Sequence, residues 1–167
     1  MRYLLIMRHA KSDWSHSGLA DHDRPLNARG ERDAPRMGRW LQSRGCVPEH
    51  IAASTALRAR KTADLVAGSS GFGGAPVYLP ELYLAGPATY IEWAVSLDDQ
   101  FHRALAIGHN PGVEELVSHL TGEAVAMPTA AVAVLRIESE RWEDFALNPR
   151  AQLESYWKPK GLPREFE

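Results

Sequence analysis

Five polar side chains that together could handle a phosphoryl group are widely separated in this sequence. Each stands at or just beyond the end of a short apolar run, and the five are Arg8, His9, Arg58, Glu81 and His109. An arginine presents a planar fork of N–H groups that matches phosphate oxygens. A neutral imidazole can attack phosphorus in line, and nearby cations keep it neutral by lowering its pKa below about 6.5. The combination predicts covalent phosphoryl transfer with His9 as the attacking group, provided that the fold brings these side chains together.

Apolar runs and helical patterns alternate along the chain, which is typical of a mostly parallel sheet. Strands buried on both faces are expected at residues 3–7, 51–53, 77–79 and 104–107. Helices are expected at about 27–44, 57–66, 88–97 and 113–120, with a kink or a late start at Pro35. A longer strand is expected at 130–137, with 142–147 pairing to it as a hairpin. The predicted fold is therefore α/β, a three-layer αβα sandwich around a mostly parallel central sheet.

This fold predicts where the five side chains meet. In open α/β sheets, ligands bind beyond the carboxyl ends of the strands. The expected strands end at Arg8-His9, at Ser54, near Glu81 and at Gly108-His109, and Arg58 lies one helical turn past Ser54. One rim of the sheet should therefore carry two arginines, two histidines and a carboxylate.

The composition favours one globular domain. The 167 residues are 44% hydrophobic and carry a net charge of -2, so the chain lacks the overall positive charge of a nucleic-acid-binding protein. No apolar segment suits a membrane span or an export signal, and the single cysteine, Cys46, is typical of a reducing compartment. We expect a cytoplasmic protein without nucleic-acid or membrane partners, with a domain over residues 1–157 and a mobile tail at 158–167.

Several segments resemble the motifs of one enzyme family. Leu-Ile-Met-Arg-His at residues 5–9 resembles the signature that opens the histidine phosphatase superfamily, which has the phosphoglycerate mutase-like fold. Similar to further motifs of that family are Ser-x-x-Leu-Arg at 54–58, Arg-Pro-Leu-Asn at 24–27 and Gly-His at 108–109. The sequence Gly-His-Asn-Pro-Gly and the modest length most resemble its small phosphohistidine phosphatase branch, SixA.

The resemblance implies a role for each matching position. His9 would be the nucleophile, and Arg8, Arg58 and His109 would form the phosphate pocket. The backbone N–H of Asn110 would donate to the phosphoryl group, and Ser15 stands where many relatives carry a phosphate-contacting Asn. Neither a metal nor a cofactor is implied.

Two roles are possible for the carboxylate of Glu81. Glu81 lies near the position of the proton donor in larger relatives, and a general acid matters most for a phosphate ester. Alternatively, Glu81 pairs with an arginine of the pocket. Asp13 and Asp21, in the first loop, are weaker candidates for the acid.

The short interval between Thr62 and His109 leaves little room for a large lid insertion. An open site suits a phosphorylated side chain of another protein, so we favour phosphohistidine on a protein as the substrate. The alternatives are a phosphatase of small phosphate esters that uses Glu81 as its acid, and a non-catalytic phosphoprotein-binding module. A phosphate ion should occupy the pocket in each case.

Overall fold

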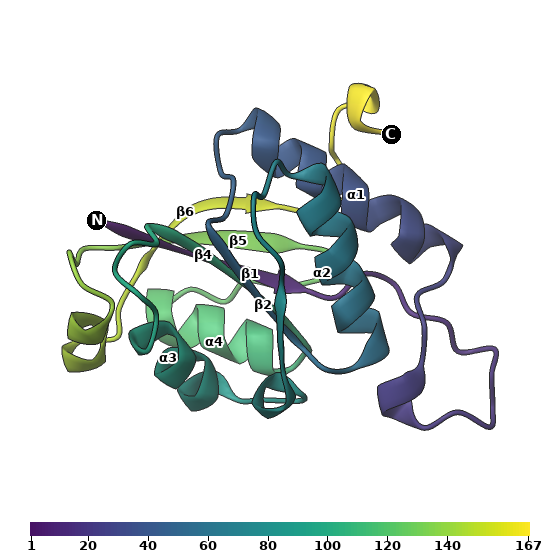
Figure 1. The fold of residues 1–167 in the computed structure, drawn as a ribbon, viewed down its shortest axis with the longest axis horizontal. Coiled ribbons are helices and arrows are strands. Elements are labelled where there is room, and N and C mark those ends of the chain that lie inside the picture. The colour runs from purple at the N-terminus through teal and green to yellow at the C-terminus, as the bar shows by residue number, and fades with distance from the viewer.

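A six-stranded sheet forms the middle layer of the protein, which a computed structural model describes over residues 1–167 (Figure 1). The order across the sheet is β3-β2-β4-β1-β5-β6. In chain order the strands are β1 (Arg2–Arg8), β2 (His50–Ser54), β3 (Val77–Leu79), β4 (Arg103–Gly108), β5 (Val132–Ile137) and β6 (Gln152–Trp157). The first four strands run parallel, whereas β5 and β6 pair antiparallel. This arrangement confirms the mostly parallel sheet.

Two helices cover each face of the sheet, as Figure 1 shows. They are α1 (Ala28–Ser43), α2 (Leu57–Ser69), α3 (Pro87–Val95) and α4 (Gly112–Thr121). Successive side chains of β1 point to opposite faces, so Leu5 and Met7 pack with α1 and α2 while Leu4 and Ile6 pack with α3 and α4. Both faces are therefore apolar, which explains the unbroken apolar run of this strand.

The first helix continues through its proline. It begins at Ala28, where the side chain of Asn27 accepts a hydrogen bond from the Gly30 N–H, and Pro35 lies inside it. The expectation of a late start at Pro35 is therefore wrong. The cap and the buried face of α1, which includes Met37 and Leu41, outweigh the loss of one backbone donor at the proline.

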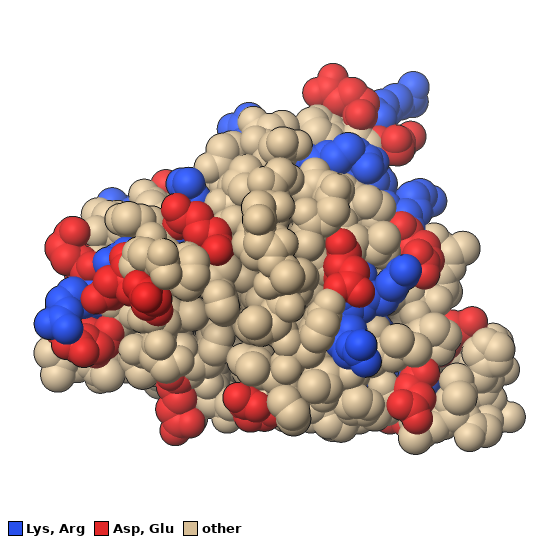
Figure 2. Space-filling model, in the orientation of Figure 1, with Lys and Arg blue, Asp and Glu red and all other residues tan.

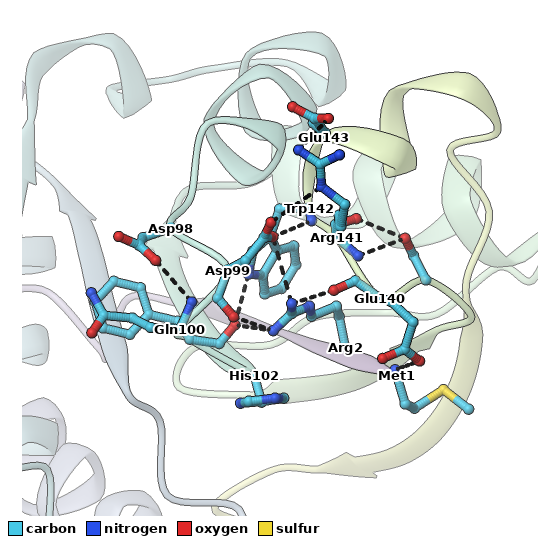
Figure 3. Close-up of polar contacts among 12 residues, drawn as sticks. Met1, Arg2, Asp98, Asp99, Gln100, His102, Glu140, Arg141, Trp142 and Glu143 are labelled. Atoms are coloured by element: carbon cyan, nitrogen blue, oxygen red, sulfur yellow. Dashed lines mark hydrogen bonds and ion pairs between the residues drawn. The ribbon is translucent and has the colours of Figure 1, made fainter.

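The expected hairpin between 130–137 and 142–147 is also wrong. Residues Glu143–Leu147 form a 3-10 helix, η3, and the strand that pairs with β5 is β6. The side chain of Trp142 is fully buried, and its indole N–H donates to the Phe101 carbonyl at 2.7 Å (Figure 3). Burying this indole draws the segment out of the plane of the sheet.

A buried arginine holds the end of the sheet opposite the candidate site (Figure 3). Arg2 is 4% exposed and donates to the carbonyl oxygens of Asp99, Phe101 and Glu140. The carboxylate of Asp99 lies 3.5 Å from the same guanidinium. These contacts join the start of β1 to two loops, the one that precedes β4 and the one that precedes η3. They keep β1 in place between its neighbours.

Residues 158–167, for which we expect mobility, lie against α1 in the structure. The Phe166 ring is 5.0 Å from the Trp40 ring, and Arg36 Nε donates to the Phe166 carbonyl at 2.8 Å.

None of the helices has both the length and the apolar character needed to cross a bilayer.

Candidate active site

Four of the predicted side chains meet at the carboxyl ends of the parallel strands. β1 and β4 pair in register, with Arg8 opposite Gly108, so His9 and His109 follow side by side. Their ring centroids are 5.1 Å apart. Arg58, on the first turn of α2, reaches both rings, and Arg8 lines the same cavity. Parallel pairing thus brings together residues that the sequence separates widely.

The cavity at this point has a volume of about 330 Å³. Most of its lining side chains are polar or charged, and Asp21 is its one carboxylate. The lining residues are Arg8, His9, Lys11, Ser12, Trp14, Asp21, Arg24, Arg58, Leu84, His109, Asn110 and Thr129. The excess of cations makes the cavity suited to an anion.

His9 is held as a neutral imidazole with one nitrogen directed at Arg58. Its Nδ1 lies 2.7 Å from the Ala10 carbonyl, which can only accept, so Nδ1 carries the proton. The lone pair is then on Nε2, 3.4 Å from Nε of Arg58. Burial, opposed by the Ala10 bond and assisted by the neighbouring His109, Arg58 and Arg8, lowers the pKa of His9 to about 3. At neutral pH Nε2 therefore carries a lone pair instead of a proton, which a nucleophile needs, and this lone pair accepts a hydrogen bond from Arg58 Nε.

His109 is neutral for similar reasons. Arg58 Nη2 lies 3.2 Å from its Nδ1, which accepts because a guanidinium can only donate. The proton is on Nε2, which donates to Ser54 Oγ at 2.8 Å. Burial and then the Arg58 charge lower the pKa of His109 to about 4. Arg58 thereby fixes the tautomer of the second histidine, and Ser54, at the end of β2, accepts the remaining N–H.

Asp21 is the residue of the cavity that sequence reasoning undervalued. Its carboxylate accepts from Arg58 Nη2 at 3.0 Å and from the Tyr83 hydroxyl, and its carbonyl accepts from Arg58 Nη1 at 2.7 Å. The Tyr83 hydrogen bond and the Arg58 guanidinium hold the pKa of Asp21 below its usual value. The signal was present, because Asp21 stands just before the Arg-Pro-Leu-Asn motif that begins with Arg24.

Arg24 continues this network to the mouth of the cavity. It donates to Asp21 Oδ1 at 3.2 Å and to the Ser12 hydroxyl, and its guanidinium lies 3.3 Å from the centroid of the Trp14 ring. Trp14 itself is 72% exposed. The indole thus covers a buried cation and forms a wall of the cavity, in addition to packing.

The structure does not bring Glu81 or Ser15 to the cavity. Glu81 is exposed in the 3-10 turn Pro80–Leu82, and the following residues Tyr83 and Leu84 face the site instead. Ser15 is exposed, and its N–H donates to the Asp13 carboxylate at 2.7 Å. Loop geometry, which no strand pattern predicts, decides both placements.

Asn110 does line the cavity, but its side chain has a supporting position. The amide nitrogen donates at 3.0 Å both to Glu114 Oε1 and to the Met127 carbonyl. The same carbonyl accepts from Arg8 Nη1 at 3.2 Å. The Met127 carbonyl thereby holds the side chains of Asn110 and Arg8, which both line the cavity.

Comparison with known proteins identifies the family. Residues 4–82 match the model of the histidine phosphatase superfamily, branch 1. An uncharacterized protein of Mycobacterium tuberculosis is 38% identical over 149 residues, which are 83% of this chain and 90% of the relative. An uncharacterized chloroplastic protein of Arabidopsis thaliana is 34% identical, over 96% of this chain and 77% of the relative.

Solved structures agree. A SixA protein from Agrobacterium tumefaciens is 27% identical with a TM-score of 0.80, over 95% of this chain and 98% of that one. The protein histidine phosphatase SixA in complex with tungstate has the same fold, with a TM-score of 0.83 at 24% identity, over 96% of this chain and 99% of that one. The chain belongs to the histidine phosphatase superfamily, in its SixA-like branch. This assignment supports phosphatase activity.

Proposed function

We propose that the protein is a phosphatase that works through a phosphohistidine on His9 and acts on phosphohistidine of another protein. The observation that carries this proposal is the neutral, buried His9, whose Nε2 lone pair lies beside Arg58 in a cation-rich cavity. In this proposal the side chains of Arg8, Arg58 and His109 bind the phosphoryl oxygens. The backbone N–H of Asn110 donates to the same group. The protein histidine phosphatase SixA, which has a similar fold, has been solved in complex with tungstate, an oxyanion, and this supports an anionic ligand for the fold.

The proposed reaction has two displacements at phosphorus. In the first, Nε2 of His9 forms a bond to phosphorus while the bond to the substrate imidazole nitrogen breaks. The departing imidazole takes the electron pair and a proton from solvent. In the second, water attacks the phosphohistidine, the bond to His9 breaks, and inorganic phosphate leaves with the proton balance restored through solvent.

The state of the cavity carboxylate favours a phosphoramidate over an ester. Asp21 has a lowered pKa and is bound to Arg58, so it is a poor proton donor at neutral pH. Glu81 is outside the cavity. An alkoxide leaving group needs a strong general acid, whereas the weaker P–N bond of phosphohistidine can be protonated from solvent.

The rim of the cavity favours a protein as the substrate. Trp14 and Leu84 are 72% and 58% exposed, although both are large apolar side chains that line a polar cavity. Leu84 has a φ of 52°, a left-handed conformation that costs a non-glycine residue about 1 kcal/mol or more. We assign these two exposed side chains, at the mouth of the cavity, to contact with the protein that presents the phosphorylated side chain.

The decisive experiment is phosphate release from a phosphohistidine-bearing carrier protein, run beside a panel of small phosphate esters and a His9→Ala control. The proposal expects fast, His9-dependent release from the protein and slow ester turnover. Preference for one ester would instead indicate the metabolite phosphatase, and phosphate binding without turnover would indicate a binding module. We further propose that the reaction needs no metal ion and takes place in the cytoplasm; loss of activity in a chelator would contradict the first point.

A further inference from the structure

A basic groove lies along α1 next to the catalytic cavity. With a volume of about 520 Å³, it is larger than that cavity. Its basic side chains are Arg29, Arg32 and Arg36 of α1 together with Lys158 and Lys160 of the C-terminal segment, and its acidic ones are Asp33 and Glu167. Basic side chains therefore outnumber acidic ones in a protein whose net charge is -2.

One buried carboxylate serves all three arginines. Asp33, whose side chain is 5% exposed, lies 3.1 Å from Arg36, 3.2 Å from Arg32 and 3.9 Å from Arg29. Arg36 also donates to the Phe166 carbonyl and is buried, so its position is structural. Arg29 and Arg32 remain mostly exposed. The single negative charge of Asp33 therefore compensates their positive charges only in part.

The two lysines add positive charge without forming an ion pair. Lys158 and Lys160 are exposed, and neither takes part in an ion pair of the structure. Figure 2 shows basic side chains over α1, below the C-terminal turn, with acidic side chains on that turn and beside α1 as well. The groove is thus a local positive surface.

The groove adjoins the catalytic cavity at one residue. Thr129 lines both, and Arg29 Nη2 lies 3.4 Å from its hydroxyl. A polypeptide whose phosphorylated side chain enters the cavity would pass Thr129 and continue over the groove. Because attraction between exposed charges acts within about 10 Å, the groove can act on residues near the phosphorylated side chain.

We propose that this groove binds an acidic segment of the phosphorylated partner protein. The proposal rests on the proposed function, because it assumes that the substrate is a protein. A nucleic acid is the less suitable polyanion, since the groove contains no aromatic side chain on which a base could stack. The groove would contribute affinity and orientation, while the cavity carries out the chemistry.

The test uses the double variant Lys158→Glu with Lys160→Glu, which leaves the catalytic residues and the Asp33 contacts in place. Its matched control is Lys61→Glu with Arg150→Glu, two exposed cations outside the groove. The substrates are a phosphohistidine peptide flanked by aspartates, the same peptide flanked by serines, and free phosphohistidine. We expect the groove variant to lose roughly tenfold in kcat/KM on the acidic peptide at low salt, and to be unchanged on the other two.

A binding measurement separates this proposal from the proposed function. Fluorescence anisotropy of the unphosphorylated acidic peptide should show salt-sensitive binding to the wild type and the control, and about tenfold weaker binding to the groove variant. This result would support the groove even if no phosphohistidine were hydrolysed. Equal loss in both variants, loss on free phosphohistidine, or tighter binding of a single-stranded oligonucleotide of equal charge would overturn it.

Discussion

Acid should destabilise this protein well above the pH at which carboxylates titrate, because its two site histidines are buried neutral. Their pKa values are about 3 for His9 and about 4 for His109, against 6.5 for an ordinary histidine. Above pH 6.5 both folded and unfolded forms are neutral, so the pair contributes no pH dependence. As the pH falls from 6.5 toward 4, these two histidines bind protons in the unfolded chain but stay neutral in the folded protein. The free energy of unfolding therefore decreases.

The size of the effect follows from the two shifts. Each unit of pH below 6.5 costs about 1.36 kcal/mol for each histidine that stays neutral in the folded state. At pH 5 the loss is therefore about 2 kcal/mol for His9 and the same for His109, or about 4 kcal/mol together. Burial also lowers the pKa of His50, which adds to the wild-type slope in the same direction.

Urea unfolding at pH 7.5, 6.5, 5.5 and 5.0 in phosphate-free buffer would measure this slope. His109→Asn should reduce the loss between pH 7.5 and 5 by about 2 kcal/mol, and His9→Asn by a similar amount. The control is Ser118→Asn, at an exposed position of α4 that carries no titratable group, which should leave the slope unchanged. Slopes that are equal in the wild type and both site variants would refute the assignment of neutral, buried imidazoles.

Three further predictions concern single positions. Arg58→Ala should lower kcat/KM by about a hundredfold or more, since it removes the donors nearest both histidines, and steady-state kinetics on phosphohistidine would check this. Glu81→Gln should leave turnover of phosphohistidine within twofold of the wild type, because the side chain is exposed and outside the cavity; a large loss on phosphate esters would restore it as the acid. Gly30→Ala should cost about 1–3 kcal/mol in thermal or urea unfolding, because its Cβ would lie 2.2 Å from the Lys11 carbonyl oxygen; an unchanged midpoint would contradict this packing.

Local patterns in the sequence predicted most of the layers and the centre of the site. The apolar run of β1 and the polar residues at its end arise from a parallel strand buried on both faces, and this pattern is visible without any contact information. The same patterns were misleading at Trp142, where burial of one indole against Phe101 replaced the expected strand with η3. At Pro35 the late start of the helix was wrong, because the cap at Asn27 and the packing of α1 outweighed a local penalty.

The sequence by itself determined the chemistry that is available: two histidines and two arginines at the ends of parallel strands, which the alternation of strands and helices must bring to one rim. Only the tertiary structure decided which carboxylate joins them. Asp21 and Glu81 both lie in or near loops, and a loop's path depends on contacts with distant residues such as Arg58 and Tyr83 rather than on its own periodicity. The basic groove likewise exists only in three dimensions, because it joins α1 to a C-terminal segment far along the chain.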